Sequence, residues 1–248
     1  QIATWSGPYF GGHIGGTQVD DDGETVQFDT NLDGGFNDTV STAAGADAFS
    51  PGFCAGPTVS SLPGSCLDDE AEFEVGLRAG YDQQFGSFVV GGLVELTGTR
   101  IEDSASAFST TPAFYTFTRE LEGMVALRGR AGFAFDRFLA YVTGGYARGD
   151  LDQTFTTSNN VNSVTQRGES EASGYQVGAG AEAQVAERLS LGLEYLFTSL
   201  DDDTRVRLAG PAPATNPFIR VNPAGTDFRR SKEEFDFHSV RVVANVRF

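Results

Sequence analysis

Several stretches of the chain alternate between apolar and other residues, and glutamate and arginine stand among the residues of the second kind. In "EFEVGLRAGYDQQFG", apolar residues such as Phe73 and Val75 alternate with Glu74 and Arg78. Opposite charges that face one another inside a protein must pair and hydrogen-bond, or their desolvation is uncompensated. We expect the charged residues that alternate with apolar ones in this way to face inward and form a packed ion-pair network. The alternatives are a narrow ion path and catalysis. The network residues are Glu74, Arg78, Glu95, Glu122, Arg128, Arg130, Glu182, Glu194 and Arg241.

Nucleophilic catalysis would need a nucleophile beside a base, and the chain has only two histidines. His13 lies in a Gly-rich stretch, and His238 directly precedes Ser239. Adjacent residues of a strand point to opposite faces, so His238 and Ser239 cannot form such a pair. A Gly-x-Ser-x-Gly motif, which would mark a nucleophilic serine, is also missing. The sequence therefore predicts no enzyme and no catalytic residue.

The two cysteines lie in "FCAGPTVSSLPGSC", a segment rich in Gly, Pro and Ser. Cys54 and Cys66 allow only one intramolecular pairing, and a metal site would need more ligands at short spacing. We expect a disulfide formed in an oxidising compartment, with two free thiols as the alternative.

Acidic residues crowd the segment "DDDGETVQFDTNLDGGFND", and no Lys or Arg precedes Arg78. Within it, Asp29, Asn31 and Asp33 have the alternating oxygen ligands of the first half of a calcium loop. The bidentate acid of such a loop would be residue 40, which is Val40. A solvated acidic loop is therefore expected. Calcium bound by Asp29, Asn31 and Asp33 with help from another loop is the alternative, and no other cofactor is expected.

Composition limits the class of protein. The 248 residues include 17 Lys and Arg against 34 Asp and Glu, so the net charge is −17. Such a chain lacks the basic face that neutralises phosphates, which excludes nucleic acid as a partner. No apolar run reaches the roughly 18 residues that a spanning helix needs. The start "QIATWSGPYF" lacks the features of a signal peptide, so Gln1 is expected to be a mature terminus after processing.

Eight segments alternate like strands, and the lengths of their connections alternate too. Three connections are expected to be tight turns, near 84–87, 136–137 and 186–187. Four are expected to be long loops, at about 20–70, 101–119, 153–169 and 200–234. Short turns at one end and long loops at the other are typical of a transmembrane β-barrel, whose strands show the bilayer alternate residues. We predict one all-β domain over 1–248, an eight-stranded antiparallel transmembrane barrel with short periplasmic turns and four long extracellular loops.

The chain ends in "HSVRVVANVRF", an alternating strand that closes on Phe248. With "TWSGPYFGGHIGG", "VALRGRAGFAFDRFLAYVTGGYARG" and "LSLGLEYLFT", it resembles the small eight-stranded outer-membrane proteins of the OmpA-transmembrane or opacity type, often labelled porin-family. The resemblance covers the strands, about half the chain. It implies the bacterial outer membrane, with loops extracellular and both termini periplasmic. It also implies that Val246 and Phe248 belong to the signal read by the barrel assembly machinery.

Eight strands leave an interior only just filled by side chains. We therefore expect a plugged polar lumen and a structural or surface-interaction protein that acts through its extracellular loops; the alternative is a small porin with weak ion or solute permeability. The expected partners are outer-membrane lipid and lipopolysaccharide, the assembly machinery, and a surface protein or further copies of the chain. Despite its length, the first loop is expected to be ordered, with Phe28, Phe36, Phe49 and Phe53 packed against other loops.

Overall fold

The computed structural model describes residues 4–19, 23–67 and 72–248. These residues contain strands and no helix long and apolar enough to cross a bilayer. The strands are β1 (Gly7–Val19), β2 (Val26–Asp29), β3 (Gly52–Ala55), β4 (Glu72–Phe85), β5 (Phe88–Ser109), β6 (Ala113–Phe135), β7 (Phe138–Thr157), β8 (Ser163–Arg167), β9 (Glu171–Gln184), β10 (Leu189–Asp201), β11 (Arg205–Ala209), β12 (Thr226–Arg230) and β13 (Glu234–Arg247).

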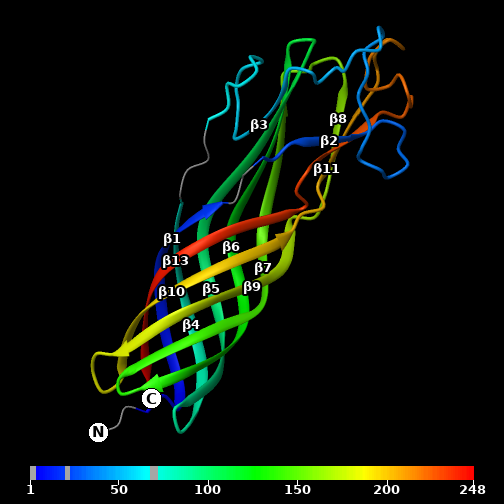
Figure 1. The fold of residues 1–248 in the computed structure, drawn as a ribbon. Coiled ribbons are helices and arrows are strands. Elements are labelled where there is room, and N and C mark those ends of the chain that lie inside the picture. The colour runs from blue at the N-terminus through cyan, green and yellow to red at the C-terminus, as the bar shows by residue number, and fades with distance from the viewer. Residues whose placement is uncertain (1–3, 20–22, 68–71) are drawn as a thin grey trace.

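The long strands close into a barrel of eight antiparallel strands, which confirms the predicted fold class (Figure 1). Around the ring the order is β1, β13, β10, β9, β7, β6, β5 and β4, and β4 pairs again with β1. The seam between the first and last strands runs from Tyr9 opposite Arg247 to Val19 opposite Phe237. Closure of the ring removes every free strand edge over this length.

At one end of the barrel the strands are joined by short turns, as the sequence predicts. Gly86 and Ser87 join β4 to β5, Asp136 and Arg137 join β6 to β7, and 185–188 join β9 to β10. Gly86 has φ +63° and Asp136 has φ +51°, the left-handed backbone that tight hairpin turns require. β1 begins and β13 ends at this turn end (Figure 1).

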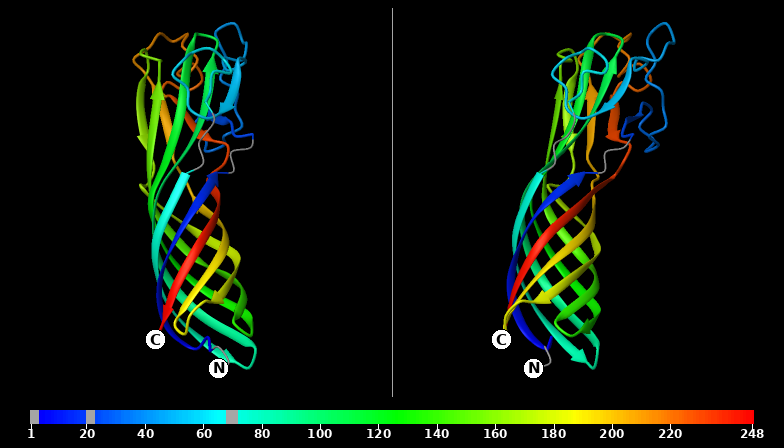
Figure 2. Two further views of the ribbon diagram at one scale, coloured as in Figure 1. Left: turned by 90° about the vertical axis from the view of Figure 1, so that its left-hand side faces the viewer. Right: turned by 60° about the vertical axis from the view of Figure 1, so that its left-hand side comes forward.

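At the opposite end two of the predicted long loops, 101–119 and 153–169, consist mostly of strand and the other two contain short strands, which corrects the boundaries drawn from the sequence. Segment 101–119 is the far part of the hairpin β5–β6, which closes only at 110–112. Segments 153–169 and 200–234 contain β8, β11 and β12. These three strands and β2 form a second sheet of order β2-β12-β11-β8. Figure 2 shows the β5–β6 hairpin rising above the ring. Ser and Thr at alternate positions gave the far part of the β5–β6 hairpin the composition of a loop, although the residues between them, such as Ala107, Tyr115 and Phe117, are buried.

These elements form a cap, defined as β2, β3, β8, β11, β12, the far ends of β5 to β7 and the segments that connect them. The cap has its own apolar core, which includes Phe28, Phe49, Val206, Leu208 and Phe228. The Phe28 ring stacks on Phe49 at 4.4 Å and meets Phe228 edge-on at 4.8 Å. The connection between β1 and β4, described over residues 23–67 and called the first connection below, is therefore packed against distant parts of the chain. Aromatic pairs of this kind stabilise the packing beyond the effect of their buried area.

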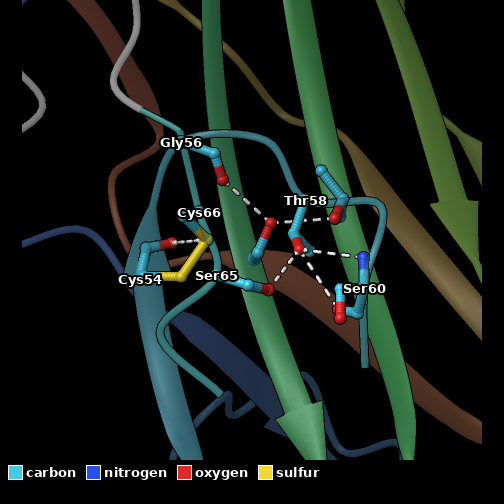
Figure 3. The surroundings of a disulfide bond; sticks show 8 residues. Cys54, Gly56, Thr58, Ser60, Ser65 and Cys66 are labelled. Carbon is cyan, nitrogen blue, oxygen red and sulfur yellow. Dashed lines mark hydrogen bonds between the residues drawn. A yellow bond between two sulfur atoms is a disulfide. The ribbon is translucent and has the colours of Figure 1, made fainter. Parts of the chain in front are cut away.

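The disulfide expected between Cys54 and Cys66 is present, with Cα atoms 6.2 Å apart (Figure 3). The segment that it closes is fastened to β5. Gly56 donates its backbone N–H to Ser104 O at 2.6 Å, and Ser106 Oγ donates to Gly56 O at 2.9 Å. β3 also pairs with β5 from Gly52 to Ala55. The disulfide therefore joins the two ends of a segment that backbone hydrogen bonds already hold on the cap.

The outer wall of the barrel is apolar between two belts of aromatic residues. Near the turns the belt contains Phe85, Phe88, Phe133, Phe135, Phe138 and Phe248, and toward the cap it contains Phe73, Tyr146, Tyr175 and Tyr195. Val246 and Phe248 both lie on this outer surface, 40% and 73% exposed. An apolar band between two aromatic girdles is what a bilayer covers on a transmembrane barrel.

Candidate functional site

The centre of the barrel holds a group of buried charges from five strands, β4, β5, β6, β10 and β13. Arg128 Nη2 lies 2.8 Å from Glu95 Oε2 and 3.2 Å from Glu194 Oε1. Arg78 Nη2 reaches the same two carboxylates at 3.2 and 3.0 Å. The Tyr141 hydroxyl donates to Glu194 Oε2 at 2.9 Å. Each carboxylate thus faces two guanidinium groups, which favours its charged form despite full burial.

The C-terminal strand supplies the third arginine of this group. Arg241 Nε donates to Glu74 Oε1 at 2.8 Å, and its Nη1 donates to Glu95 Oε1 at 2.6 Å. Ser239 Oγ, two residues away on the same face of β13, donates to Glu74 Oε2 at 3.3 Å. His13 of β1 completes the contacts of Glu95, with Nδ1 3.6 Å from Oε2. Glu95 therefore links all three arginines.

A second group lies closer to the turns. Arg130 pairs with Asp82 and, at 2.6 Å, with Glu182. Arg247 Nη2 reaches Asp82 Oδ2 at 2.7 Å, and Asn245 Nδ2 donates to Glu182 Oε2 at 3.1 Å. The Arg130 guanidinium also stacks between the rings of Tyr9 and Tyr141, at 4.7 and 5.0 Å. Both the ion pairs and the ring contacts hold the Arg130 guanidinium in place at this level.

We call these two groups the lumen network. Within the described residues its charges balance, five guanidinium groups against five carboxylates: Arg78, Arg128, Arg130, Arg241 and Arg247, and Glu74, Asp82, Glu95, Glu182 and Glu194. Asp82 and Arg247 were not among the residues expected from sequence. The alternation of residues could have identified both, because Asp82 lies on the same face of β4 as Arg78, and Arg247 lies on the same face of β13 as Arg241.

Glu122 does not join the network, which corrects the expectation for this residue. Its side chain is exposed on the outer wall. The pairing of β6 with β7 passes from Leu121 opposite Leu151 to Gly123 opposite Asp150, so Glu122 is an extra residue at a β-bulge. A bulge reverses the alternation of the strand beyond it. Leu121 and Arg119 consequently point inward in place of Glu122 and Glu120.

The inward residues of β6 pass through successive layers from the turn end to the cap. Arg130 and Arg128 lie in the lumen network, and Ala126, Met124 and Leu121 follow in an apolar layer. Phe235 and Phe237 of β13 fill the same layer and are fully buried. Beyond it Arg119 enters a second charged group. A solute passing along the axis would have to cross both kinds of layer.

This second charged group, the neck cluster, contains Glu24, Asp103, Arg119, Asp202 and Arg230. Arg119 Nε donates to Asp103 Oδ2 at 2.7 Å, and Arg230 Nη2 lies 2.8 Å from the same oxygen. Burial by itself raises the pKa of the Asp103 carboxyl, but the Arg230 and Arg119 guanidinium groups outweigh it and hold this pKa below its ordinary value. Sequence reasoning missed the cluster because its members lie far apart in the chain and beyond the bulge.

The candidate calcium ligands lie in the first connection. The Asp29 carboxylate accepts backbone N–H groups from Leu32 at 2.6 Å and Gly34 at 2.8 Å. Asn31 Nδ2 donates to Asp33 Oδ2 at 3.1 Å. Over the described part of the chain, no three acidic, His or Cys side chains are grouped as for a metal ion. Asp20, Asp21 and Asp22 lie outside the described residues, and calcium binding stays a prediction.

The two histidines take different environments. His238 lies on the outer wall, where its Nδ1 and the Tyr195 hydroxyl are 2.7 Å apart. Ser239 points into the lumen toward Glu74. The two neighbours therefore face opposite sides of the wall, so His238 and Ser239 do not form a nucleophile–base pair.

The lumen network predicts a large cost for an unbalanced charge. In Arg128→Met the free energy of unfolding should fall by about 3–5 kcal/mol, because Glu95 and Glu194 stay buried with fewer partners. The double variant Arg128→Met/Glu194→Gln should recover a large part of this loss. Arg100→Met is the control, since its pair with Glu120 is largely exposed and should contribute at most about 1 kcal/mol. Urea unfolding in lipid vesicles measures all three, and additive effects in the double variant would contradict the pairing.

The neck cluster predicts an acid-sensitive cap. The pKa of Asp103 is lower in the folded protein than in the unfolded chain, so its carboxylate stabilises the fold above about pH 4. That contribution is lost as the pH falls through the lower folded value. The rate of amide hydrogen exchange in residues 113–121, divided by the intrinsic exchange rate at each pH, should be constant from pH 7 to 5 and rise below about pH 4.

In Asp103→Asn this exchange should be faster already at pH 7 and respond less to acid. Asp152→Asn, which alters an exposed carboxylate of β7, is the control and should behave like the unaltered protein. An undiminished acid response in Asp103→Asn would show that another group is responsible.

Comparison with known proteins agrees with this architecture. Residues 2–248 match the family described as the outer membrane protein beta-barrel domain. The chain is 28% identical over 178 residues to a 31 kDa outer-membrane immunogenic protein of Brucella melitensis, a match of 71% of this chain and 66%, just under two thirds, of that relative. It is 39% identical over 74 residues to a 22 kDa outer membrane protein of Rhizobium leguminosarum, covering 29% of this chain and 31% of the relative.

Among solved structures, the outer membrane protein OprG of Pseudomonas aeruginosa covers all of both chains with a TM-score of 0.50 and 12% sequence identity. At this identity the likeness concerns the fold alone. The match over nearly the whole chain, the closed ring of eight strands and the apolar wall lead to one conclusion. The chain belongs to the family of outer membrane protein β-barrel domains and is a protein of the bacterial outer membrane.

Proposed function

We propose that this protein is a closed, non-conducting barrel that carries a folded cap for contacts at the cell surface. The observation that supports this most is the stack of layers inside the barrel. The balanced lumen network, the apolar layer around Phe235 and Phe237, and the neck cluster follow one another along the axis. Each charged layer is held by several ion pairs, so opening a path would leave buried charges with fewer partners.

The proposed orientation places the cap outside the cell and the turns in the periplasm. Short turns on the periplasmic side and longer external segments are the rule for bacterial outer-membrane barrels. In this orientation the apolar wall contacts outer-membrane lipid, and the strands beyond the upper aromatic belt pass through the lipopolysaccharide layer. Val246 and Phe248, exposed on the wall at the periplasmic end, are then placed for recognition by the barrel assembly machinery.

A role without catalysis fits the chemistry of the site. The buried carboxylates are engaged by arginines, and His238 and Ser239 lie on opposite faces of the wall. The cap instead offers a rigid surface, because the first connection, the β5–β6 hairpin and β12 share one apolar core. Such a surface suits contact with a surface protein or with further copies of the chain.

A small porin is the second candidate, and one observation favours it. Arg78 and Arg128 each leave two guanidinium nitrogens, Nε and Nη1, without a protein hydrogen-bond partner in the described part of the chain. Nitrogens of this kind could line a narrow hydrated path through the lumen network. The apolar layer between this network and the cap argues against continuity of that path.

Orientation is testable by labelling intact cells. Thr165→Cys places a thiol on the exposed strand β8, and Arg137→Cys places one in the turn between β6 and β7. A membrane-impermeant maleimide should label the first variant on intact cells and the second only after the outer membrane is opened. Labelling of Arg137→Cys alone on intact cells would reverse the orientation.

Conductance separates the two candidate functions. The purified protein in a planar bilayer should show no steady open level under conditions in which a general diffusion porin does. A stable open level would overturn the closed barrel. If Glu95→Gln then changed the ion selectivity of that level, the current would be assigned to the lumen and the porin would be the better description.

A further inference from the structure

Three arginines stand side by side on the cap sheet. In the register of this sheet, Arg205 of β11 is directly opposite Arg167 of β8 on one side and Arg229 of β12 on the other. Neighbouring strands are about 4.8 Å apart, so the row spans roughly 10 Å. Directly opposed like charges destabilise a sheet. Such a row is unexpected in a chain with twice as many acidic as basic residues.

Two of these arginines are free to bind an anion. Arg167 and Arg205 are exposed, and within the described residues neither has a carboxylate oxygen within 4 Å. Their neighbour Arg207 is instead held by Asp227, with contacts of 2.5 and 2.6 Å. Arg229 donates to Gln27 and to Glu233. The free positive charge of the row is therefore concentrated on β8 and β11.

A recess lies beside the two free arginines. It has a volume of about 290 Å³ and is lined by Arg167, Gly168, Asp203, Arg205, Arg207 and Asp227. With Arg207 neutralised by Asp227, two guanidinium groups face the single carboxylate of Asp203, so the recess favours an anion. A recess of this size accommodates one or two sugar units, whereas a flat protein surface would not enter it.

Phe36 contacts two of the three arginines of the row, Arg205 and Arg229. Its ring, which is buried, lies 5.1 Å from the guanidinium carbon of Arg205 and 4.4 Å from that of Arg229. A cation over an aromatic face is attracted to it and loses freedom of movement. The entropy cost of ordering Arg205 on ligand binding is correspondingly smaller.

The height of the row restricts the source of the anion. Arg205 follows Tyr195 of the upper aromatic belt by ten residues. Six of these residues continue β10 as far as Asp201, which at about 3.3 Å per residue and a strand tilt of roughly 40° lies about 15 Å above that belt, and β11, which begins at Arg205, lies above this point (Figure 1). The headgroup layer of a bilayer adds only about 5–8 Å on each side of the hydrocarbon core. The row is therefore beyond lipid headgroups and at the level of sugars that extend from the membrane.

We propose that Arg167 and Arg205 bind a saccharide bearing carboxylate or phosphate groups at this recess. Planar guanidinium groups match both kinds of oxyanion through two parallel hydrogen bonds. The inference rests on the proposed surface-contact function and gives it a ligand class. The saccharide comes either from the surrounding lipopolysaccharide or from a separate acidic polysaccharide, and these two sources carry the same anionic groups.

The test measures binding to the folded protein in detergent. The probes are the phosphorylated core oligosaccharide of the producing bacterium, an oligogalacturonate and a neutral dextran oligosaccharide. At least one acidic probe should bind and dextran should not, and added salt should weaken binding. In Arg167→Gln/Arg205→Gln affinity should fall roughly tenfold or more, because two charge-assisted contacts are lost. Arg137→Gln/Arg188→Gln makes the same charge change in the turns and should bind normally.

Each outcome has a definite meaning. Binding of the core oligosaccharide alone assigns the site to the surrounding lipopolysaccharide, and binding of oligogalacturonate alone assigns it to a separate polysaccharide. Failure of both acidic probes, or equal loss in the turn variant, overturns the site. A closed barrel without saccharide binding would refute only this inference, whereas a conducting barrel that binds saccharide would refute only the proposed function.

Discussion

The need to pair buried charge governs the interior of this barrel. Eight strands enclose too little space for bulk water, so every inward Glu or Arg loses most of its hydration. The five arginines and five acids of the lumen network meet this requirement across six strands that are distant in sequence. Because Glu95 contacts Arg78, Arg128 and Arg241 at once, the register of β4, β5, β6 and β13 is coupled through one carboxylate. A shift of one strand by one residue would expose these charges to lipid.

The alternation of residues was sufficient to predict the ring, the tight turns and most of the lumen network, because a period of two assigns each side chain to one face. It failed where the period itself changed. Glu122 lies at a bulge, and a single extra residue reversed the faces of everything beyond it on β6. The neck cluster was out of reach for another reason: Glu24 and Arg230 are 206 residues apart, and no local pattern brings them together. The far part of the β5–β6 hairpin was missed because its Ser and Thr content resembles that of a loop, whereas β2, β3, β8, β11 and β12 were missed because each has only four or five residues.

The cap differs from the flexible loops that a long connection usually forms. A segment of about 50 residues with few apolar side chains would ordinarily remain disordered. Here Phe28 and Phe49 join Val206 and Leu208 in one core, and the Cys54–Cys66 disulfide shortens the remaining free segment. β5 and β6 continue without interruption from the membrane band into this core, so the cap is attached to the barrel by paired strands.

A closed interior and a rigid cap together move the chemistry of this protein to its outer surface. Charges inside are paired with one another, whereas Arg167 and Arg205 on the cap sheet are exposed and have no carboxylate partner among the described residues. The acidic excess of the chain makes this contrast useful for selecting one anion over another. Repulsion by the net charge of −17 disfavours anions that approach elsewhere, and only a ligand able to engage the arginine row directly overcomes it. Specificity would then arise from two exposed guanidinium groups, of which that of Arg205 is held by Phe36, on a scaffold that needs no rearrangement to present them.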